Sequence, residues 1–207
     1  MNKTLLVSYT PRLESNTAKL VQTFIQASEG KSEISHLELA KEPAPLLLEE
    51  NLNALLKRNY MGMELTKSEN IAVDGADKML KQLQEADRIV IAFPMYNFSL
   101  PAAVKAWIDA IIQKEKTFTI TEKGRYKGLC QEKRALILMT AGGDYSQGPA
   151  KDMNYATPLI QSCMNLMGID SHTITAYGLN QYMDSADDIV AGAQQEIVGY
   201  VDQNSCW

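Results

Sequence analysis

The sequence predicts an α/β fold, with a doubly wound parallel sheet whose strands are joined by crossover helices. Short β-branched runs alternate along the chain with longer segments of helical period, which is the pattern of this class. Several of the runs are apolar throughout, as expected of strands buried on both faces. About five strands and five helices are expected, and this number fits the strand order 2-1-3-4-5. With 207 residues, of which 45% are hydrophobic, the chain is expected to fold as a single domain over residues 1–207.

The expected strands follow one another at intervals that leave room for a helix between them. Residues 4–8 form a continuous apolar run, which predicts the central strand of the sheet. Residues 35–39 are only modestly hydrophobic, which suits a strand at an edge. Residues 88–93 and 135–140 are again apolar and predict two further buried strands. Residues 171–176 are the expected fifth strand.

Apolar residues spaced three and four apart predict the helices between these strands. Leu20, Val21 and Phe24 mark the first helix, and Gly30 is expected to end it as a C-cap glycine. Pro101 stands in the first turn of a later helix, where its missing N–H does no harm. The later helices are expected at residues 77–86, 100–111, 159–167 and 189–201.

Residues 41–73 support two interpretations. Pro43 and Pro45 break regular structure, and a helical stripe of leucines follows them. Residues 60–63, Tyr-Met-Gly-Met, then form an apolar cluster. The segment either packs on the core in the ordinary way or presents a hydrophobic face that builds a contact between subunits.

Composition and charge argue against several classes of function. The formal net charge is −5, so no overall positive field exists to hold nucleic acid or an anionic membrane surface. Three cysteines without CxxC spacing and two histidines argue against a disulfide scaffold and against a metal site. No apolar run approaches the roughly 20 residues of a membrane helix, and no signal-peptide pattern is visible. A cytoplasmic location is therefore expected, with Cys206 and Trp207 at a frayed terminus or in a dimer contact.

Ligands in open α/β sheets bind beyond the carboxyl ends of the strands, so the loops after the first, third and fourth strands are the candidate site. In the first loop, Ser15, Asn16 and Thr17 stand at a helix start, where free N–H groups attract an anion. Arg12 adds a forked guanidinium, and together these residues favour a phosphate site. The simpler alternative makes Ser15 only an N-cap. The Walker and GxGxxG patterns are absent, which argues against an NTPase and a Rossmann dehydrogenase.

The other two loops suggest a flat ligand. Residues 94–101, Pro-Met-Tyr-Asn-Phe-Ser-Leu-Pro, place two aromatic rings and a thioether between prolines, which makes a wall for a planar heteroaromatic ring. Alternatively, the two rings merely cap the core. Residues 140–145 contain Gly142 and Gly143, which permit positive φ and let backbone N–H groups approach a ligand closely. Alternatively, the glycine pair marks an ordinary turn.

The run at residues 94–101 and the residues that follow it, Ala102 to Asp109, resemble the FMN-dependent NAD(P)H azoreductases and quinone reductases of the flavodoxin-like fold. Further matches are Thr117-Phe118-x-x-Thr121-Glu122-x-Gly124, Gly128-Leu129, Lys133 and the T-x-G-G loop at Thr140. The resemblance implies a flavodoxin-like three-layer α/β/α sandwich with a five-stranded parallel sheet. It also implies FMN as the cofactor and a homodimer with FMN at the interface, which would explain the apolar cluster at residues 60–63.

The resemblance also assigns roles to individual residues. The residues implied to hold the FMN phosphate are Thr10, Arg12, Ser15, Asn16 and Thr17. Those implied to pack along the isoalloxazine are Pro94, Met95, Tyr96, Asn97 and Phe98. Those implied to approach its pyrimidine end are Thr140, Gly142 and Gly143. Ala141 and Tyr145 complete the expected cofactor-binding set, and Tyr145 is also expected to border the acceptor. Phe118 matches an aromatic residue that lines the substrate pocket of the neighbouring subunit, and the expected catalytic residues are Asn97 and Phe118.

The activity implied by the resemblance is an oxidoreductase reaction in two steps. NADH or NADPH gives a hydride to FMN and leaves, and a flat acceptor such as a quinone or azo compound then takes the electrons. One alternative is an electron carrier of the flavodoxin type, which passes electrons to protein partners. A second is a flavin-free phosphate-ester hydrolase, which the absence of a CxxxxxR loop argues against.

Overall fold

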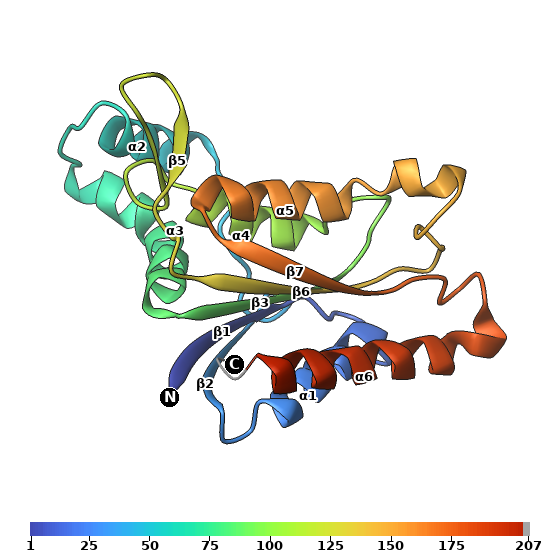
Figure 1. Ribbon diagram of the computed structural model, residues 1–207. Coiled ribbons are helices and arrows are strands. Elements are labelled where there is room, and N and C mark those ends of the chain that lie inside the picture. Colours follow the sequence, from blue (N-terminus) through green and yellow to red (C-terminus); the bar gives the residue numbers. More distant parts are fainter. Residues whose placement is uncertain (205–207) are drawn as a thin grey trace.

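The computed structural model describes residues 1–204, and a five-stranded parallel sheet lies at its centre (Figure 1). The strand order is β2-β1-β3-β6-β7, which is the expected order once a separate hairpin is set aside. The strands are β1 (Asn2–Ser8), β2 (Ser32–Glu38), β3 (Arg88–Pro94), β6 (Arg134–Thr140) and β7 (Asp170–Ala176). Cys206 and Trp207 lie outside the described residues.

The expected order places the first strand correctly, but the prediction that this strand is the central one is wrong. β3, and not β1, is the middle strand of the sheet, whereas β1 lies between β2 and β3. A continuous apolar run shows only that both faces of a strand are covered, and every interior strand of a parallel sheet has that property. The expected edge position of the second strand is confirmed, because β2 has a single neighbour.

Helices cover both faces of the sheet and make three layers (Figure 1). α1 (Asn16–Ala27) and α6 (Ala186–Gln203) pack together on one face. The opposite face carries α3 (Lys67–Glu85), α4 (Ala102–Ile111) and α5 (Ala156–Met167). Two short 3-10 helices, Pro149–Met153 and Met183–Ser185, stand in the connections before α5 and α6. No helix in the described part of the chain is long and apolar enough to cross a membrane.

The first helix ends earlier than its glycine suggests. α1 ends at Ala27 with Ser28 as its C-cap, because the N–H of Ser28 donates to the carbonyl of Phe24 at 3.0 Å. Gly30 stands beyond the helix with φ at 73°, in the turn that leads into β2. Glycine is required there by the turn and not by the helix cap.

Residues 41–73 contain the whole of α2 (Glu49–Asn59) and the first turns of α3. α3 begins ten residues before the helix expected at residue 77, because Thr66 and Glu69 make a reciprocal capping box at its N-terminus. α2 packs against α3 and buries only Ala54 and Leu55. The segment therefore adds a small cluster of its own to the fold and leaves most of its leucines exposed.

A two-stranded antiparallel hairpin lies outside the main sheet. Its strands are β4 (Phe118–Ile120) and β5 (Tyr126–Gly128). In Figure 1 the hairpin is at the upper left, away from the edge at which the sheet strands end. Strands of three residues are too short to show a period, so the pattern of the sequence does not reveal them.

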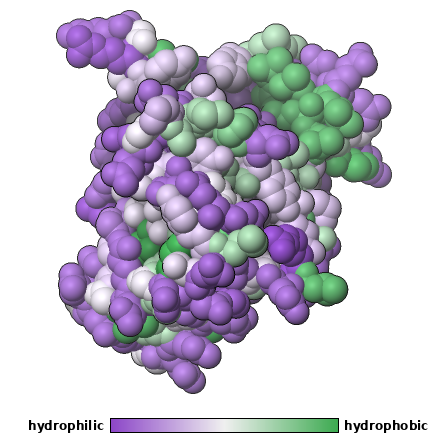
Figure 2. All heavy atoms as spheres, turned by 90° about the vertical axis from the view of Figure 1, so that its right-hand side faces the viewer, coloured by the Kyte–Doolittle hydropathy of each residue, from purple (hydrophilic) through white to green (hydrophobic). Residues whose placement is uncertain are grey.

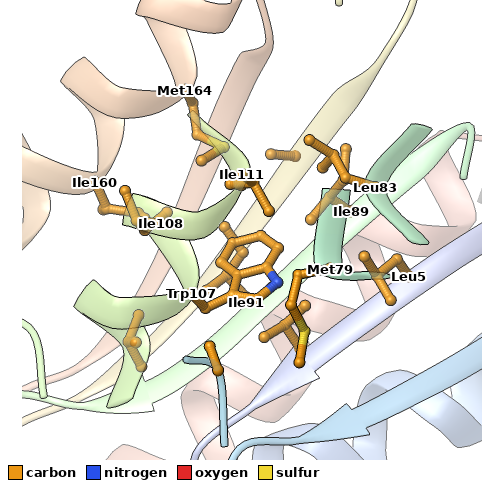
Figure 3. Close-up of a cluster of buried hydrophobic side chains, with 14 of the residues drawn as sticks. Leu5, Met79, Leu83, Ile89, Ile91, Trp107, Ile108, Ile111, Ile160 and Met164 are labelled. Atoms are coloured by element: carbon orange, nitrogen blue, oxygen red, sulfur yellow. The ribbon is translucent and has the colours of Figure 1, made fainter. Parts of the chain in front are cut away.

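Each face of the sheet has its own hydrophobic core. The larger core surrounds the indole ring of Trp107 on α4, which is fully buried. Figure 3 shows Met79 and Leu83 on the α3 side of the ring and Ile160 and Met164 on the α5 side. This packing holds α3, α4 and α5 against the sheet, so the loops between them have a rigid base.

Candidate active site

The loops after β1, β3 and β6 meet at one cavity beyond the carboxyl ends of the strands. Its volume is about 320 Å³, which lies within the range of small-molecule sites. Figure 2 looks onto this edge of the sheet and shows a mainly hydrophilic surface there. The lining residues are Pro11, Arg12, Ser15, Asn16, Thr17, Pro94, Met95, Tyr96, Asn97, Thr140, Ala141, Gly142, Leu179 and Asn180.

The N-terminus of α1 forms one end of the cavity. Ser15 is the N-cap, and its Oγ accepts a hydrogen bond from the N–H of Ala18 at 3.1 Å. The first backbone N–H groups of a helix have no partner within the helix and carry its positive dipole end. Asn16 and Thr17 present this end to the cavity, and the exposed Arg12 adds its positive charge. This end of the cavity suits an anion.

The hydroxyl of Thr17 is engaged elsewhere. Its Oγ1 lies 2.7 Å from Oγ1 of Thr140, and both side chains are buried. Thr17 therefore has its backbone to offer to an anion, and its side chain joins the first loop to the third. The carbonyl of Thr140 also accepts the N–H of Met95 at 2.8 Å. Thr140 is thus the point where all three loops are held together.

Thr10, which is expected to bind the phosphate, faces away from the cavity. Its hydroxyl donates to Glu38 Oε2 at 2.7 Å, and its N–H donates to Glu38 Oε1 at 3.1 Å. Thr10 lines a separate hollow together with Glu38 and His36, at the edge of the sheet formed by β2. The structure therefore does not bring Thr10 together with the other residues of the first loop.

The second loop contains a tight and strained turn. The N–H of Tyr96 donates to the carbonyl of Ser99 at 3.0 Å, and the N–H of Ser99 donates to the carbonyl of Tyr96 at 3.0 Å. Between them, φ is 46° at Asn97 and 70° at Phe98. Two central residues with positive φ are typical of a type I′ turn, which favours asparagine or glycine. Each such residue costs about 1–3 kcal/mol, a strain that clusters at functional sites.

The turn also separates its two aromatic rings. Tyr96 lines the cavity and meets Tyr9 edge to face, with ring centroids 6.0 Å apart. Phe98 is not a lining residue and instead packs edge to face on Tyr145 at 6.3 Å. Tyr145 also meets Tyr177 at 6.0 Å, so the rim of the site beside the cavity is aromatic.

The third loop needs its first glycine for space and not for positive φ, since neither Gly142 nor Gly143 has positive φ. A Cβ at Gly142 would lie 2.5 Å from Nδ2 of Asn180, closer than real Cβ atoms approach. The loop after β7 lies directly against it. The N–H of Asn180 donates to the carbonyl of Gly142 at 2.9 Å, and that of Leu179 donates to the carbonyl of Ala141 at 3.1 Å.

Leu179 and Asn180 line the cavity although sequence reasoning did not select them. The signal that finds them is positional, because they follow the fifth strand of a sheet whose other strand ends were already suspected. Pro11 was missed for a different reason, since a proline carries no side-chain donor. Its place beside Arg12 brings it to the cavity wall.

Four further residues of the expected set lie outside the cavity lining: Phe98, Gly143, Tyr145 and Phe118. The first three adjoin it through the second and third loops. Phe118 is in the β4–β5 hairpin, where it is 5% exposed and meets Tyr126 at 5.8 Å. It therefore takes no part in the cavity of its own chain.

Asp144 is the acidic residue nearest in sequence to the paired glycines. The Ser146 hydroxyl donates to Asp144 Oδ1 at 2.6 Å and the Ser146 N–H donates to it at 2.9 Å. These hydrogen bonds lower the pKa of Asp144, so its carboxylate stays charged and directed into its own loop. Asp144 is not a lining residue of the cavity.

Comparison with protein families and curated proteins covers nearly the whole chain. A family model described as flavodoxin-like fold matches residues 2–201. FMN-dependent NADH:quinone oxidoreductase 4 of Bacillus cereus is 33% identical over 190 residues, which are 90% of this chain and 90% of that protein. FMN-dependent NADH:quinone oxidoreductase 1 of Bacillus licheniformis is 33% identical over 202 residues, which are 95% of this chain and 96% of that protein.

Solved structures give the same result in three dimensions. An azoreductase from Bacillus anthracis superposes with a TM-score of 0.90 at 32% identity, over 98% of this chain and 100% of that one. An FMN-dependent NADH-azoreductase from Bacillus anthracis, solved in complex with FMN, superposes with a TM-score of 0.87 at 25% identity. That alignment covers 99% of this chain and 100% of the other.

Proposed function

The chain belongs to the flavodoxin-like fold family, among the FMN-dependent NADH:quinone oxidoreductases and azoreductases, and from this we propose that it transfers a hydride from NADH through bound FMN to a flat acceptor. Quinones and azo compounds are the proposed acceptors, by analogy with the names of the relatives. The observation that carries the proposal is the cavity, which joins an anion-binding helix end to a rigid aromatic turn.

The residues present fit FMN. A phosphate group needs a helix N-terminus or a guanidinium, and the cavity offers both at Asn16, Thr17 and Arg12. A planar ring system needs a flat apolar wall, which Pro94, Met95 and Tyr96 provide. Gly142 and Asn180 lie side by side in the cavity wall, and a side chain at Gly142 would clash with the amide of Asn180.

Unused backbone donors stand at two places in the site, on the cavity lining at Asn97 and Gly142 and beside the lining at Phe98 and Gly143. Among the hydrogen bonds of residues 1–204, none engages the N–H groups of Asn97 and Phe98 in the turn or those of Gly142 and Gly143. Preorganised N–H groups stabilise negative charge that develops on a bound group without any reorganisation. We assign these donors to the polar atoms of the flavin ring.

When bound, FMN would carry out the redox chemistry, taking a hydride from NADH and passing the electrons on. The chain would supply binding, orientation and electrostatics. Arg12 and the N-terminus of α1 would hold the anionic end of FMN, and residues 94–97 would then offer their wall to its ring system. The strained turn keeps its shape because β3 and Ser99 hold both of its ends. No side-chain nucleophile is needed for this reaction.

We further propose a homodimer with the cofactor at the interface. Exposed apolar side chains are concentrated on α2 and beside it, at Leu46, Leu48, Leu52, Leu56, Tyr60, Met61 and Met63. Figure 2 shows an extended hydrophobic patch at its upper right. As the family resemblance implies, Phe118 is proposed to serve the site of the neighbouring subunit. A cytoplasmic location and a single domain remain predictions.

Sedimentation tests the dimer. Leu52→Asp is expected to convert the dimer to a monomer, because it buries a charge in the contact. The matched control is Val198→Asp, which places the same charge at an exposed position on α6. A monomeric wild-type protein, or equal behaviour of the two variants, contradicts the proposed contact.

The activity itself is tested by anaerobic reduction and reoxidation. NADH alone is expected to bleach the visible absorption of the bound flavin, and a quinone is expected to restore it over many cycles. The alternative, a flavodoxin-type carrier, predicts that NADH leaves the flavin oxidised until a protein partner is added. The relatives named as NADH:quinone oxidoreductases support the enzyme.

A further inference from the structure

The carboxylate of Glu38 collects hydrogen bonds beside the first loop. It lies at the end of β2, half-buried, and lines the hollow that also contains Thr10. The hydroxyl and N–H of Thr10 donate to it at 2.7 and 3.1 Å. The hydroxyl of Ser8 donates at 2.7 Å, and the N–H of Ala40 donates at 3.1 Å. Four donors from two segments of the chain therefore converge on one side chain.

This arrangement keeps Glu38 ionised. Burial by itself would raise the pKa of Glu38, but the hydrogen bonds from Thr10, Ser8 and Ala40 outweigh burial and lower it. The proton of the Ser8 hydroxyl is directed to Glu38, so the Ser8 oxygen is free to accept from Nε2 of His36 at 2.7 Å. The charge of the carboxylate is thus compensated by four hydrogen-bond donors.

Thr10 is the last residue of the first loop that the sheet holds in place. The N–H of Tyr9 donates to the carbonyl of Ala92 on β3 at 2.9 Å, and Thr10 is then bonded to Glu38 on β2. The next two residues, Pro11 and Arg12, already line the cavity. The conformation of Thr10 therefore sets the direction in which Pro11 and Arg12 leave the sheet.

Resting on the proposed function, we infer that Glu38 is a positioning residue, which binds the donors of Thr10 so that Pro11 and Arg12 face the cofactor phosphate. Glu38 itself does not touch the cofactor, because it lies outside the cavity lining. Two possible effects of the carboxylate on FMN have opposite signs. Its negative charge opposes a bound phosphate, whereas its hold on Thr10 favours one. The hold on Thr10 outweighs the repulsion between the carboxylate and the phosphate.

Glu38→Gln separates the two effects. A glutamine has one acceptor oxygen instead of two and turns an NH₂ group toward donors, so it cannot accept all the bonds that Glu38 accepts. Titration of the full-length apoprotein by flavin fluorescence is expected to show an FMN Kd about tenfold higher than in the wild type. The Kd for riboflavin, which lacks the phosphate, is expected to stay nearly unchanged.

Three further variants complete the test. Thr10→Val keeps the shape and the N–H of Thr10 but removes its hydroxyl, so its FMN Kd is expected to rise about threefold. In the double variant Glu38→Gln with Thr10→Val the two losses are expected to be less than additive, because they act on one contact. Glu33→Gln is the matched control, since it removes an exposed carboxylate from the same strand and should leave the FMN Kd unchanged.

The outcomes are distinct. An FMN Kd that is unchanged or lower in Glu38→Gln overturns the inference, as does an equal loss of FMN and riboflavin, which indicates general disorder of the fold. Thermal unfolding of each apoprotein shows whether the titrations are made on folded protein. A wild-type apoprotein that binds neither flavin overturns the proposed function itself.

Discussion

The core around Trp107 and the loops at the carboxyl edge of the sheet are built on different principles. In the core, apolar side chains from three helices and the sheet make the contacts, and the backbone is regular. At the edge, backbone hydrogen bonds and tight turns shape the loops, and Asn97 and Phe98 are held at positive φ. Stability is therefore concentrated in the first region and binding in the second, and substitutions should separate the two.

The largest effect is expected in the core. Trp107→Ala removes a fully buried indole ring and is expected to lower the free energy of unfolding by about 3–5 kcal/mol. Trp107→Phe, which keeps an aromatic ring, should lose less. Urea unfolding measures both. If Trp107→Ala weakened FMN binding in the folded protein without lowering stability, the separation between the two regions would be wrong.

The next effect belongs to the anion end of the site. Arg12 is exposed and lines the cavity, so Arg12→Ala should change stability little. Loss of a charge-assisted hydrogen bond to the phosphate is expected to cost about 2 kcal/mol of FMN binding free energy. Apoprotein titrations at low and high salt should show a smaller salt dependence in the variant. A matching loss of riboflavin affinity would argue against a phosphate contact.

Gly142→Ala tests whether the third loop requires a glycine because no side chain fits beside Asn180. The added Cβ would press on the amide of Asn180, which would be pushed toward the cavity. We expect about a tenfold weaker FMN Kd, equivalent to 1.4 kcal/mol, with a smaller change in unfolding free energy. Gly192→Ala is the control, because open space surrounds that residue in α6. Loss of FMN binding in the control would point to an indirect effect.

The smallest effect is expected at the strained turn. Asn97→Ala should leave FMN bound and lower the rate of its reduction by NADH about threefold, less than 1 kcal/mol of activation free energy. Asn97→Gly is a useful companion, because glycine adopts a φ of 46° without strain. If only the alanine variant is slow in single-turnover measurements, the turn geometry matters; if both are slow, the side chain does.

The same contrast explains which features the sequence predicts. The buried strands follow from apolar runs such as residues 88–93, because burial leaves a direct trace in composition. The sheet order follows from the alternation of about five strands with helices. Which interior strand lies in the middle of the sheet leaves no such trace, since all interior strands have similar composition. The hairpin β4–β5 is too short to show a period.

Within the site, the type of a residue predicted its place near the cavity better than it predicted the hydrogen-bond partner of its side chain. Ser15, Asn16 and Arg12 lie on the cavity as expected, yet the hydroxyl of Thr17 is paired with Thr140 and that of Thr10 with Glu38. A hydroxyl near a helix start suits several partners, and only the packing of neighbouring strands decides among them. Asn180 was not predicted because its loop contains no recognisable motif. Hydrogen bonds to the carbonyl of Gly142 position this loop at the cavity.

A crystal structure of the complex with FMN is the most direct test of the account. We expect the phosphate to lie at the N-terminus of α1, within hydrogen-bond distance of Arg12 or of the N–H groups of Asn16 and Thr17. We expect the ring system to lie against residues 94–97. A phosphate bound at the hollow beside Thr10 and Glu38, or a ring system away from the strained turn, would contradict it.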